Sequence, residues 1–251
     1  MIEVTKDRRI LRITLNRPEK RNALNLELCK QLVEALDGAD TDRGVGAVVL
    51  NANGPAFCAG MDLKETIDVD QTRLADIHER LFTTIHRIRT PIIAAVHGAA
   101  LAGGTGLAAN GHMVIARDDA RFGLTEIRIG LWPVLIFRSI EHAMGERRAV
   151  ELSLTGREFS AGEARDYGLV TEIADDPLRR ATDLAMQLAG FSPVAITAGL
   201  DYVHQIRGRD WEDAGRVGRV VRDRLLSNED FKEGARAFLE KRHPSWPSLR
   251  S

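Results

Sequence analysis

The 251-residue sequence has few of the residues that build disulfide frameworks or metal centres. It holds two cysteines, Cys29 and Cys58, which form neither a CxxC pair nor a metal-ligand spacing, and so low a count is typical of proteins in a reducing cytosol. The seven histidines are scattered singly, and no HExxH motif occurs. We therefore expect no metal site.

The sequence also lacks an excess of charge of one sign and a long apolar run. Lys and Arg number 35 against 36 Asp and Glu, a net charge of −1, so we expect no nucleic-acid and no membrane partner. The apolar stretches fall well short of the ~18 residues that a membrane span needs, and the start, MIEVTKDRRI, lacks the apolar segment of a secretory signal. With 44% hydrophobic and 28% charged residues, the composition predicts a globular, cytoplasmic protein.

Hydrophobic patterning predicts an alternation of strands and helices up to about residue 116. Such an alternation is typical of βαβ units and of the α/β class. A helix is expected after Asn25, which is a plausible N-cap, and a second amphipathic helix over 71–89. Strands are expected at 10–15, where apolar and polar residues alternate and 3–9 can pair as a hairpin, and at the apolar runs 45–50, 92–96 and 113–116.

The remainder of the chain is predicted to be mainly helical. Ser160 and Glu163 have the spacing of a capping box, and Gly168 stands where a glycine would end that helix. Ser227 and Asp230 suggest the start of a later helix.

The segment FSPVAI (191–196) is the best candidate for a boundary between two parts of the chain. We therefore divide the chain into a sheet-containing core, 1–192, and a helical C-terminal region, 193–251.

Two glycine-bearing turns each follow a predicted buried strand. The first, NGPAFCAGMDLKE (53–65), follows 45–50, and the second, ALAGGTGLAA (100–109), follows 92–96. At the ends of neighbouring parallel strands, such turns can present two free backbone N–H groups to one point, which makes an oxyanion hole. Taken alone, each turn is more often a device for close packing. There is no GxSxG elbow and no phosphate-binding loop, so the hydrolase and nucleotide interpretations are weak.

The segment ARFGLTEIRIGLWP (120–133) adds a carboxylate, Glu126, among apolar neighbours. Desolvation raises the pKa of such a carboxyl group, as a proton shuttle near neutral pH requires. The alternative is a solvated glutamate at the end of a strand, and for an arbitrary glutamate that alternative is favoured.

Together these segments resemble the crotonase superfamily, also called the enoyl-CoA hydratase/isomerase family. The resemblance covers nearly the whole chain, with several motifs in the family's order and spacing. The matching segments are LNRPEKRNALN (15–25), FCAGMDLKE (57–65), PIIAAVHGAALAGGTGLAA (91–109), ARFGLTEIRIGL (120–131), ELSLTGREFSAGEARDYGLVTEI (151–173) and EGARAFLEKRHPSW (233–246).

The resemblance implies an α/β fold in which repeated ββα turns form a spiral of two roughly perpendicular sheets, followed by a helical C-terminal trimerisation region. It implies trimers, often stacked as hexamers, and substrates that are coenzyme A thioesters. It also implies no metal or redox cofactor, since coenzyme A is part of the substrate.

By motif position, the resemblance assigns the oxyanion hole to the backbone N–H groups of Met61 and Gly103, and the acid/base role to Glu126. It implies that Gly103 and Gly104 let the thioester oxygen reach the backbone. The residues expected at the substrate by this resemblance are Lys20, Arg21, Met61, Asp62, Leu63, Lys64, Gly103, Gly104, Gly106 and Trp132.

One departure from the family pattern bears on the reaction. Typical enoyl-CoA hydratases carry two glutamates; the second corresponds to Glu126, but the first corresponds to Gly106. Water addition benefits from two such groups, whereas a single carboxylate suffices to move a proton along one face. The sequence thus resembles the 3,2-enoyl-CoA isomerase branch, and we favour double-bond isomerisation. Hydration by one glutamate is the alternative, and a non-catalytic acyl-CoA-binding protein is a further one.

A second departure is WPVLIF (132–137), which replaces a glycine-rich stretch of many hydratases. Bulky Trp132, Leu135 and Phe137 would fill space that water and the acyl chain otherwise occupy, although they are also suited to packing a diverged core.

Two further features of the sequence stay open. A second catalytic acid could come from the first glycine-bearing turn or the residues after it, where Asp62, Glu65, Asp68 and Asp70 are candidates. His112 replaces an aspartate that is common at its position in the family, and the sequence gives no functional account of it.

Overall fold

The computed structural model describes residues 1–68 and 70–250, and it contains two sheets. In the larger sheet β1 and β2 form the predicted antiparallel hairpin, and the other pairs are parallel. β3 is buried along its whole length, as its unbroken apolar run predicted. In order across the sheet, the strands are β1 (Ile2–Asp7), β2 (Ile10–Leu15), β3 (Ala47–Ala52), β5 (Ile92–Val96), β7 (Met113–Ala116) and β10 (Glu172–Ile173).

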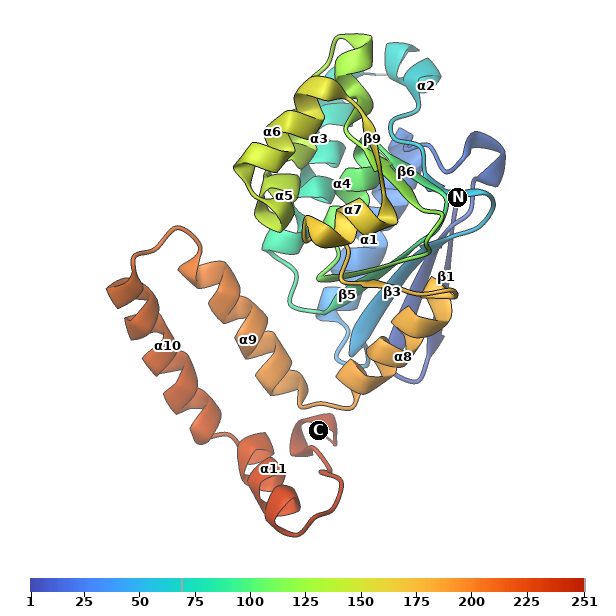
Figure 1. Cartoon of the computed structure of the whole chain (residues 1–251). Coiled ribbons are helices and arrows are strands. Elements are labelled where there is room, and N and C mark those ends of the chain that lie inside the picture. The colour runs from blue at the N-terminus through green and yellow to red at the C-terminus, as the bar shows by residue number, and fades with distance from the viewer. Residues whose placement is uncertain (69, 251) are drawn as a thin grey trace.

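The smaller sheet consists of three-residue strands that the hydrophobic pattern did not predict. β4 pairs with β6 and β6 with β8 in parallel, and β9 closes the sheet antiparallel to β8. β3, β5 and β7 of the first sheet are each followed by a strand of the second, so β3–β4, β5–β6 and β7–β8 are successive turns of a ββα spiral. The expected α/β spiral is thereby confirmed (Figure 1). These strands are β4 (Ala56–Cys58), β6 (Ala99–Leu101), β8 (Arg121–Gly123) and β9 (Glu158–Ser160).

Helices complete the core on both faces of the larger sheet. On one face Ala181 and Ala185 of α8 pack against Val49 and Ile93. The other face belongs to a larger apolar cluster shared with α1, α4 and α5. The helices of this part are α1 (Leu26–Thr41), α2 (Leu63–Asp68), α3 (Gln71–Phe82), α4 (Gly103–Ala109), α5 (Val134–Met144), α6 (Glu146–Thr155), α7 (Ala161–Asp166) and α8 (Pro177–Ala189).

Several predicted helix ends are confirmed. The side chain of Asn25 accepts a hydrogen bond from the backbone N–H of Leu28 at 2.9 Å and so caps α1. Ser160 and Glu163 form the capping box of α7, and Gly168, at φ +93°, follows that helix in the left-handed conformation.

Two predicted helix bounds are wrong. The helix expected over 71–89 ends at Phe82, where a 3-10 turn, Thr84–His86, takes over. Tertiary contact explains the early end, because the backbone N–H of Ile85 donates to the Asn110 side chain at 3.2 Å instead of continuing the helix. The last helix is capped by Asn228, and Ser227 ends the preceding one.

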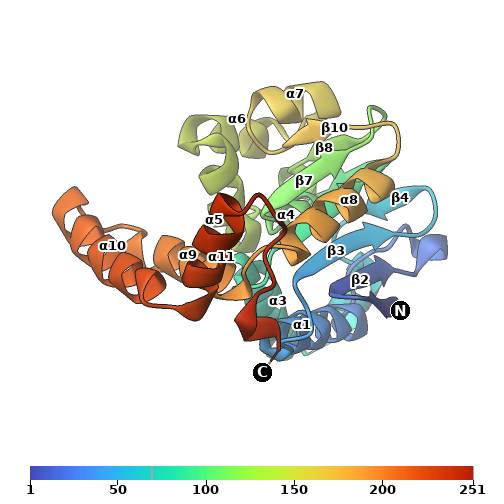
Figure 2. The same cartoon turned by 90° about the horizontal axis from the view of Figure 1, so that it is seen from below.

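Three helices near the C-terminus extend away from the sheets (Figures 1 and 2), and a 3-10 turn, Pro247–Leu249, follows them. The helices are α9 (Pro193–Ile206), α10 (Trp211–Leu226) and α11 (Glu229–Leu239). Ser192 caps α9, so the helical part begins where the sequence placed the boundary, while the division of the chain into two units remains a prediction. Within the described ranges, none of the helices is both long and apolar enough to cross a bilayer.

Candidate active site

The two glycine-bearing turns lie against each other. The first, 53–65, follows β3 as predicted and contains β4, and the second, 100–109, follows β5 and begins in β6; β4 and β6 are parallel neighbours. A Cβ atom built on Gly60, at φ +93°, would lie 2.9 Å from the Cβ of Ala102 and 3.5 Å from the backbone N of Gly103. Glycine at position 60 therefore permits the close approach that brings the peptide of Met61 to the start of α4.

Met61 and Gly103 have free backbone donors. Neither N–H group donates to an acceptor among the described residues, and Gly103 is the first residue of α4, where helix N–H groups have no partner within the helix. Both residues line one cavity of about 300 Å³. The arrangement suits an oxygen that accumulates negative charge, because it offers two N–H donors beside an apolar space.

Ala102 holds the second donor in place with a strained backbone. Its φ of +50° and ψ of −123° lie in a region that favours glycine. The conformation is fixed from both sides: Ala102 N–H donates to the carbonyl of Gly123 at 2.7 Å, and the hydroxyl of Thr105 lies 2.6 Å from the carbonyl of Ala100. Ala102 and Gly103 both line the cavity, so this strained residue stands directly before the second donor.

Residues of the segment 15–25 hold the loop that carries the other donor, the N–H group of Met61. Leu24 donates its N–H to the carbonyl of Gly60 at 2.7 Å and accepts from the N–H of Asp62 at 2.9 Å. The Arg17 guanidinium donates to the Asp62 carboxylate at 2.7 Å, and these side chains are only 13% and 12% exposed. Although burial alone raises the pKa of Asp62, the hydrogen bond from Arg17 holds it below its usual value. Asp62 is therefore an ionised brace and not a second acid.

Glu126 projects into the same cavity from a 3-10 turn, Thr125–Ile129, that follows β8. One carboxylate oxygen, Oε2, is buried and has no hydrogen-bond partner in the described chain. Burial raises the pKa of Glu126 above 4.5, opposed only in part by a hydrogen bond from its own backbone N–H. A carboxylate with a free oxygen and a raised pKa is suited to taking and returning a proton near neutral pH.

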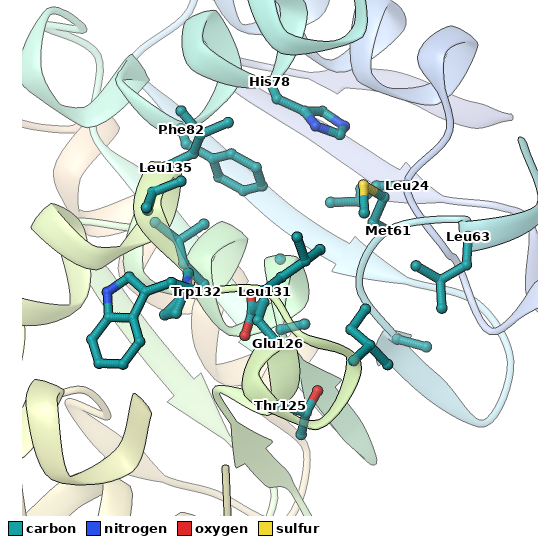
Figure 3. A pocket seen from close by; sticks show the side chains of 17 residues that line it. Leu24, Met61, Leu63, His78, Phe82, Thr125, Glu126, Leu131, Trp132 and Leu135 are labelled. Carbon is teal, nitrogen blue, oxygen red and sulfur yellow. The ribbon is translucent and has the colours of Figure 1, made fainter. Parts of the chain in front are cut away.

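The cavity around Glu126 is mainly apolar, as Figure 3 shows. Glu126 is the one acidic residue among the described residues of its wall. The remaining lining residues are Leu24, Ala59, Met61, Leu63, His78, Phe82, Ala102, Gly103, Thr125, Ile129, Leu131, Trp132, Pro133, Val134, Leu135 and Ile136.

Gly106 does not line this cavity, contrary to its placement among the substrate-contacting residues. It is buried in α4, and a Cβ atom built on it would lie 2.2 Å from Cγ2 of Ile136. Ile136, on α5 and 3% exposed, forms the wall in its place. The position of the family's first glutamate is thus closed by a branched apolar side chain.

Gly104 also has a packing role where a substrate-facing one was expected. Its own Cβ would lie 2.1 Å from the carbonyl oxygen of Cys58, so glycine is required for α4 to rest on β4. Of the other expected residues, Leu63 and Trp132 line the cavity, whereas Lys20, Arg21 and Lys64 are exposed outside it.

The remaining candidate acids do not reach the cavity wall. Asp70 caps α3, with its side chain accepting from the N–H of Thr72 at 2.9 Å. Glu65 lies in α2 and is not part of the lining. The side chain of Asp68 lies outside the described part of the chain.

Sequence reasoning missed His78, a buried residue of α3 that lines the cavity. Its Nε2 has no partner in the described chain, and burial lowers its pKa, so the ring is neutral near pH 7. A signal was present: His78 stands four residues after Leu74 and four before Phe82, on the apolar stripe of the predicted helix.

Comparison with known proteins identifies the family of the chain. A family model described as enoyl-CoA hydratase/isomerase matches residues 5–249. The 2,3-dehydroadipyl-CoA hydratase of Escherichia coli is 36% identical over 97% of this chain and 97% of its own. An enoyl-CoA hydratase of Mycobacterium tuberculosis is 32% identical over 93% and 91%. The crystal structure of an enoyl-CoA hydratase from Mycobacterium smegmatis superposes with a TM-score of 0.92 at 32% identity, covering 98% of both chains. This chain is an enzyme that belongs to the enoyl-CoA hydratase/isomerase family.

Proposed function

We propose that this enzyme moves the double bond of an enoyl-CoA thioester from C3–C4 to C2–C3, with Glu126 as its single acid/base. The observation that carries the proposal is the pairing of one orphaned carboxylate with the closure of the opposite position by Ile136. Moving a double bond requires one group that removes a proton from one carbon and returns it to another. Excluding water from the site favours this reaction over the addition of water.

The proposed reaction has two proton transfers. The Glu126 carboxylate removes a proton from C2, and the electrons of that C–H bond move into the thioester as a dienolate. The N–H groups of Met61 and Gly103 stabilise the negative charge on the thioester oxygen. The protonated Glu126 then delivers its proton to C4, which leaves the double bond between C2 and C3 and the carboxylate ionised for the next turnover.

In this proposal the acyl chain occupies the apolar cavity, and the coenzyme A portion lies outside it. Lys20, Arg21 and Lys64 are exposed cations that do not line the cavity, and such side chains are suited to the phosphates of coenzyme A. The cavity walls near Leu131 and Trp132 favour an apolar acyl group (Figure 3).

Hydration is the second candidate, favoured by the names of the relatives, which include 2,3-dehydroadipyl-CoA hydratase and enoyl-CoA hydratase. Glu126 would then take a proton from water as its oxygen attacks C3, and return that proton to C2. Both candidates use the same oxyanion hole.

A tracer experiment separates the two. A 3-enoyl-CoA thioester carrying deuterium at C2 is converted by the wild-type enzyme, and the product is analysed by mass spectrometry and NMR. Isomerisation through one carboxylate predicts a 2-enoyl product with part of the deuterium at C4. Failure to convert the 3-enoyl thioester, by an enzyme preparation that adds water to crotonyl-CoA under the same conditions, would overturn the isomerase assignment.

We also propose that the C-terminal helices mediate assembly into a homotrimer or hexamer. Large apolar side chains are exposed on them: Trp211 is 94%, Phe238 82% and Leu239 80% exposed. Faces of this kind mark interaction surfaces. Light scattering during size-exclusion chromatography tests the assembly, and a monomer at micromolar concentration would contradict it.

A further inference from the structure

A second cavity, of about 260 Å³, lies apart from the active site, between the core and α9. It gathers cationic and imidazole side chains from four segments that are distant in sequence. His86 comes from the turn after α3, His112 precedes β7, His142 is on α5, and Arg207 follows α9. No Asp or Glu occurs among the described residues of its wall. The cavity therefore offers donors and positive charge without an opposing carboxylate.

The position of the ring proton of His112 is defined, and the N–H group that carries it has no hydrogen-bond acceptor in the described chain. Its Nδ1 accepts a hydrogen bond from the backbone N–H of Ile92 at 3.0 Å, so the proton of the neutral ring is on Nε2. That Nε2–H is buried and has no partner in the described chain. Burial lowers the pKa of His112 to about 4, so the ring is neutral near pH 7. A buried donor of this kind requires an acceptor.

Arg207 supplies a second orphaned donor and a charge. One of its terminal nitrogens donates to Nδ1 of His86, while its Nε–H is buried without a partner in the described chain. It forms no ion pair with a described carboxylate, and the charged neighbour that shifts its pKa is Arg138, another cation. Because a guanidinium stays protonated, Arg207 brings to the cavity a positive charge that has no ion-pair partner among the described carboxylates.

The histidine at position 112 supplies a donor to the cavity and no negative charge. Its Nδ1 accepts from the backbone N–H of Ile92, which leaves the Nε2–H for a ligand. An aspartate at this position would instead place a negative charge near Arg207. Water can satisfy the two N–H groups, but it does not neutralise the charge, whereas an oxyanion does both.

We propose that this cavity binds a small oxyanion, with inorganic phosphate as its simplest form, through the Nε–H of Arg207 and the Nε2–H of His112. The site is independent of the reaction proposed above, since none of its residues lines the active-site cavity.

Isothermal titration with inorganic phosphate at constant ionic strength tests the proposal on the full chain. Wild type is expected to bind phosphate saturably. Arg207→Gln should weaken binding at least about tenfold, as loss of a charged hydrogen bond does. His112→Asp should abolish phosphate binding, because the new carboxylate neutralises the positive charge of Arg207 while it still accepts the hydrogen bond from Ile92. Arg209→Gln is the matched control: it is exposed two residues away and should bind as wild type does.

Circular dichroism melts of all four proteins establish that the variants are folded. Absence of saturable binding by wild type would overturn the proposal. Equal binding by all four proteins would also overturn it, because that result places the phosphate elsewhere.

Discussion

Ile136 occupies the position that a side chain on Gly106 would take, since Cγ2 of Ile136 lies 2.2 Å from where the Cβ atom would be. The pair separates this chain from a two-glutamate hydratase more firmly than the glycine alone does. A side chain at position 106 would clash with Ile136 of α5, so a glutamate introduced there by one substitution has no space to occupy.

Gly106→Glu alone is expected to destabilise the protein by roughly 1–3 kcal/mol or more, because it overpacks a filled site. Gly106→Glu combined with Ile136→Gly should recover part of this loss and gain hydration of crotonyl-CoA. Denaturant unfolding measures the stability. Gly38→Glu is the control, since Gly38 is an exposed helical glycine with open space around it. Equal losses for Gly38→Glu and Gly106→Glu would refute the packing argument.

Glu126→Gln should lower kcat by about 10²–10⁴-fold, the usual contribution of a positioned acid/base. Binding of the acyl-CoA should persist, because the amide has nearly the same shape and the Met61 and Gly103 donors are untouched. Steady-state kinetics and equilibrium binding together check this. Turnover at the wild-type rate would remove Glu126 from the mechanism.

The stability of Glu126→Gln should depend on pH relative to wild type. Because burial raises the folded-state pKa of Glu126 above 4.5, its stabilising contribution belongs to the protonated form and is lost as pH rises through that pKa. At pH 7 the variant should thus be more stable by about 1 kcal/mol, the cost of an unpaired buried polar group. The difference should shrink toward pH 4. Unfolding at several pH values measures it, and a pH-independent difference would contradict this account.

Ala102→Gly should stabilise the protein by roughly 1 kcal/mol, since it relieves backbone strain of about 1–3 kcal/mol against glycine's larger unfolded-state entropy. Turnover should fall, because the Gly103 peptide is then held less firmly. Ala108→Gly, in the same region but inside α4, should instead lose about 1 kcal/mol. Thermal melts and kinetics compare the two, and a destabilised Ala102→Gly would show that its conformation is not strained.

Much of the fold was predictable, because local chemistry determines it. The cap at Asn25, the capping box at Ser160 and the apolar strand near 45–50 depend on neighbours in sequence. The short strands of the second sheet were not, since three residues carry too little pattern to distinguish a strand from a loop. The end of α3 at Phe82 depends on Asn110, which no local pattern reveals.

The sequence motifs predicted only the part of the site that they contain. The two turns and Glu126 lie close together because β4 and β6, within the turns, and β8, before Glu126, are neighbours in the smaller sheet. The sequence does not reveal that Gly104 serves packing against Cys58, or that Ile136 covers Gly106, because both contacts join segments distant in sequence. His78 was within reach of sequence reasoning, because its spacing of four residues from Leu74 and from Phe82 places it on the apolar stripe of the predicted helix.

The ratio of two rates for the wild-type enzyme distinguishes most directly between a single-carboxylate isomerase and a hydratase. The values of kcat/KM are measured for isomerisation of a 3-enoyl-CoA and for hydration of crotonyl-CoA, under identical conditions and with product masses determined. One carboxylate beside a wall closed by Ile136 predicts that isomerisation is the faster reaction by at least about tenfold, since hydration lacks its second group. Efficient addition of water to crotonyl-CoA, with slow or absent movement of the double bond, would contradict the account.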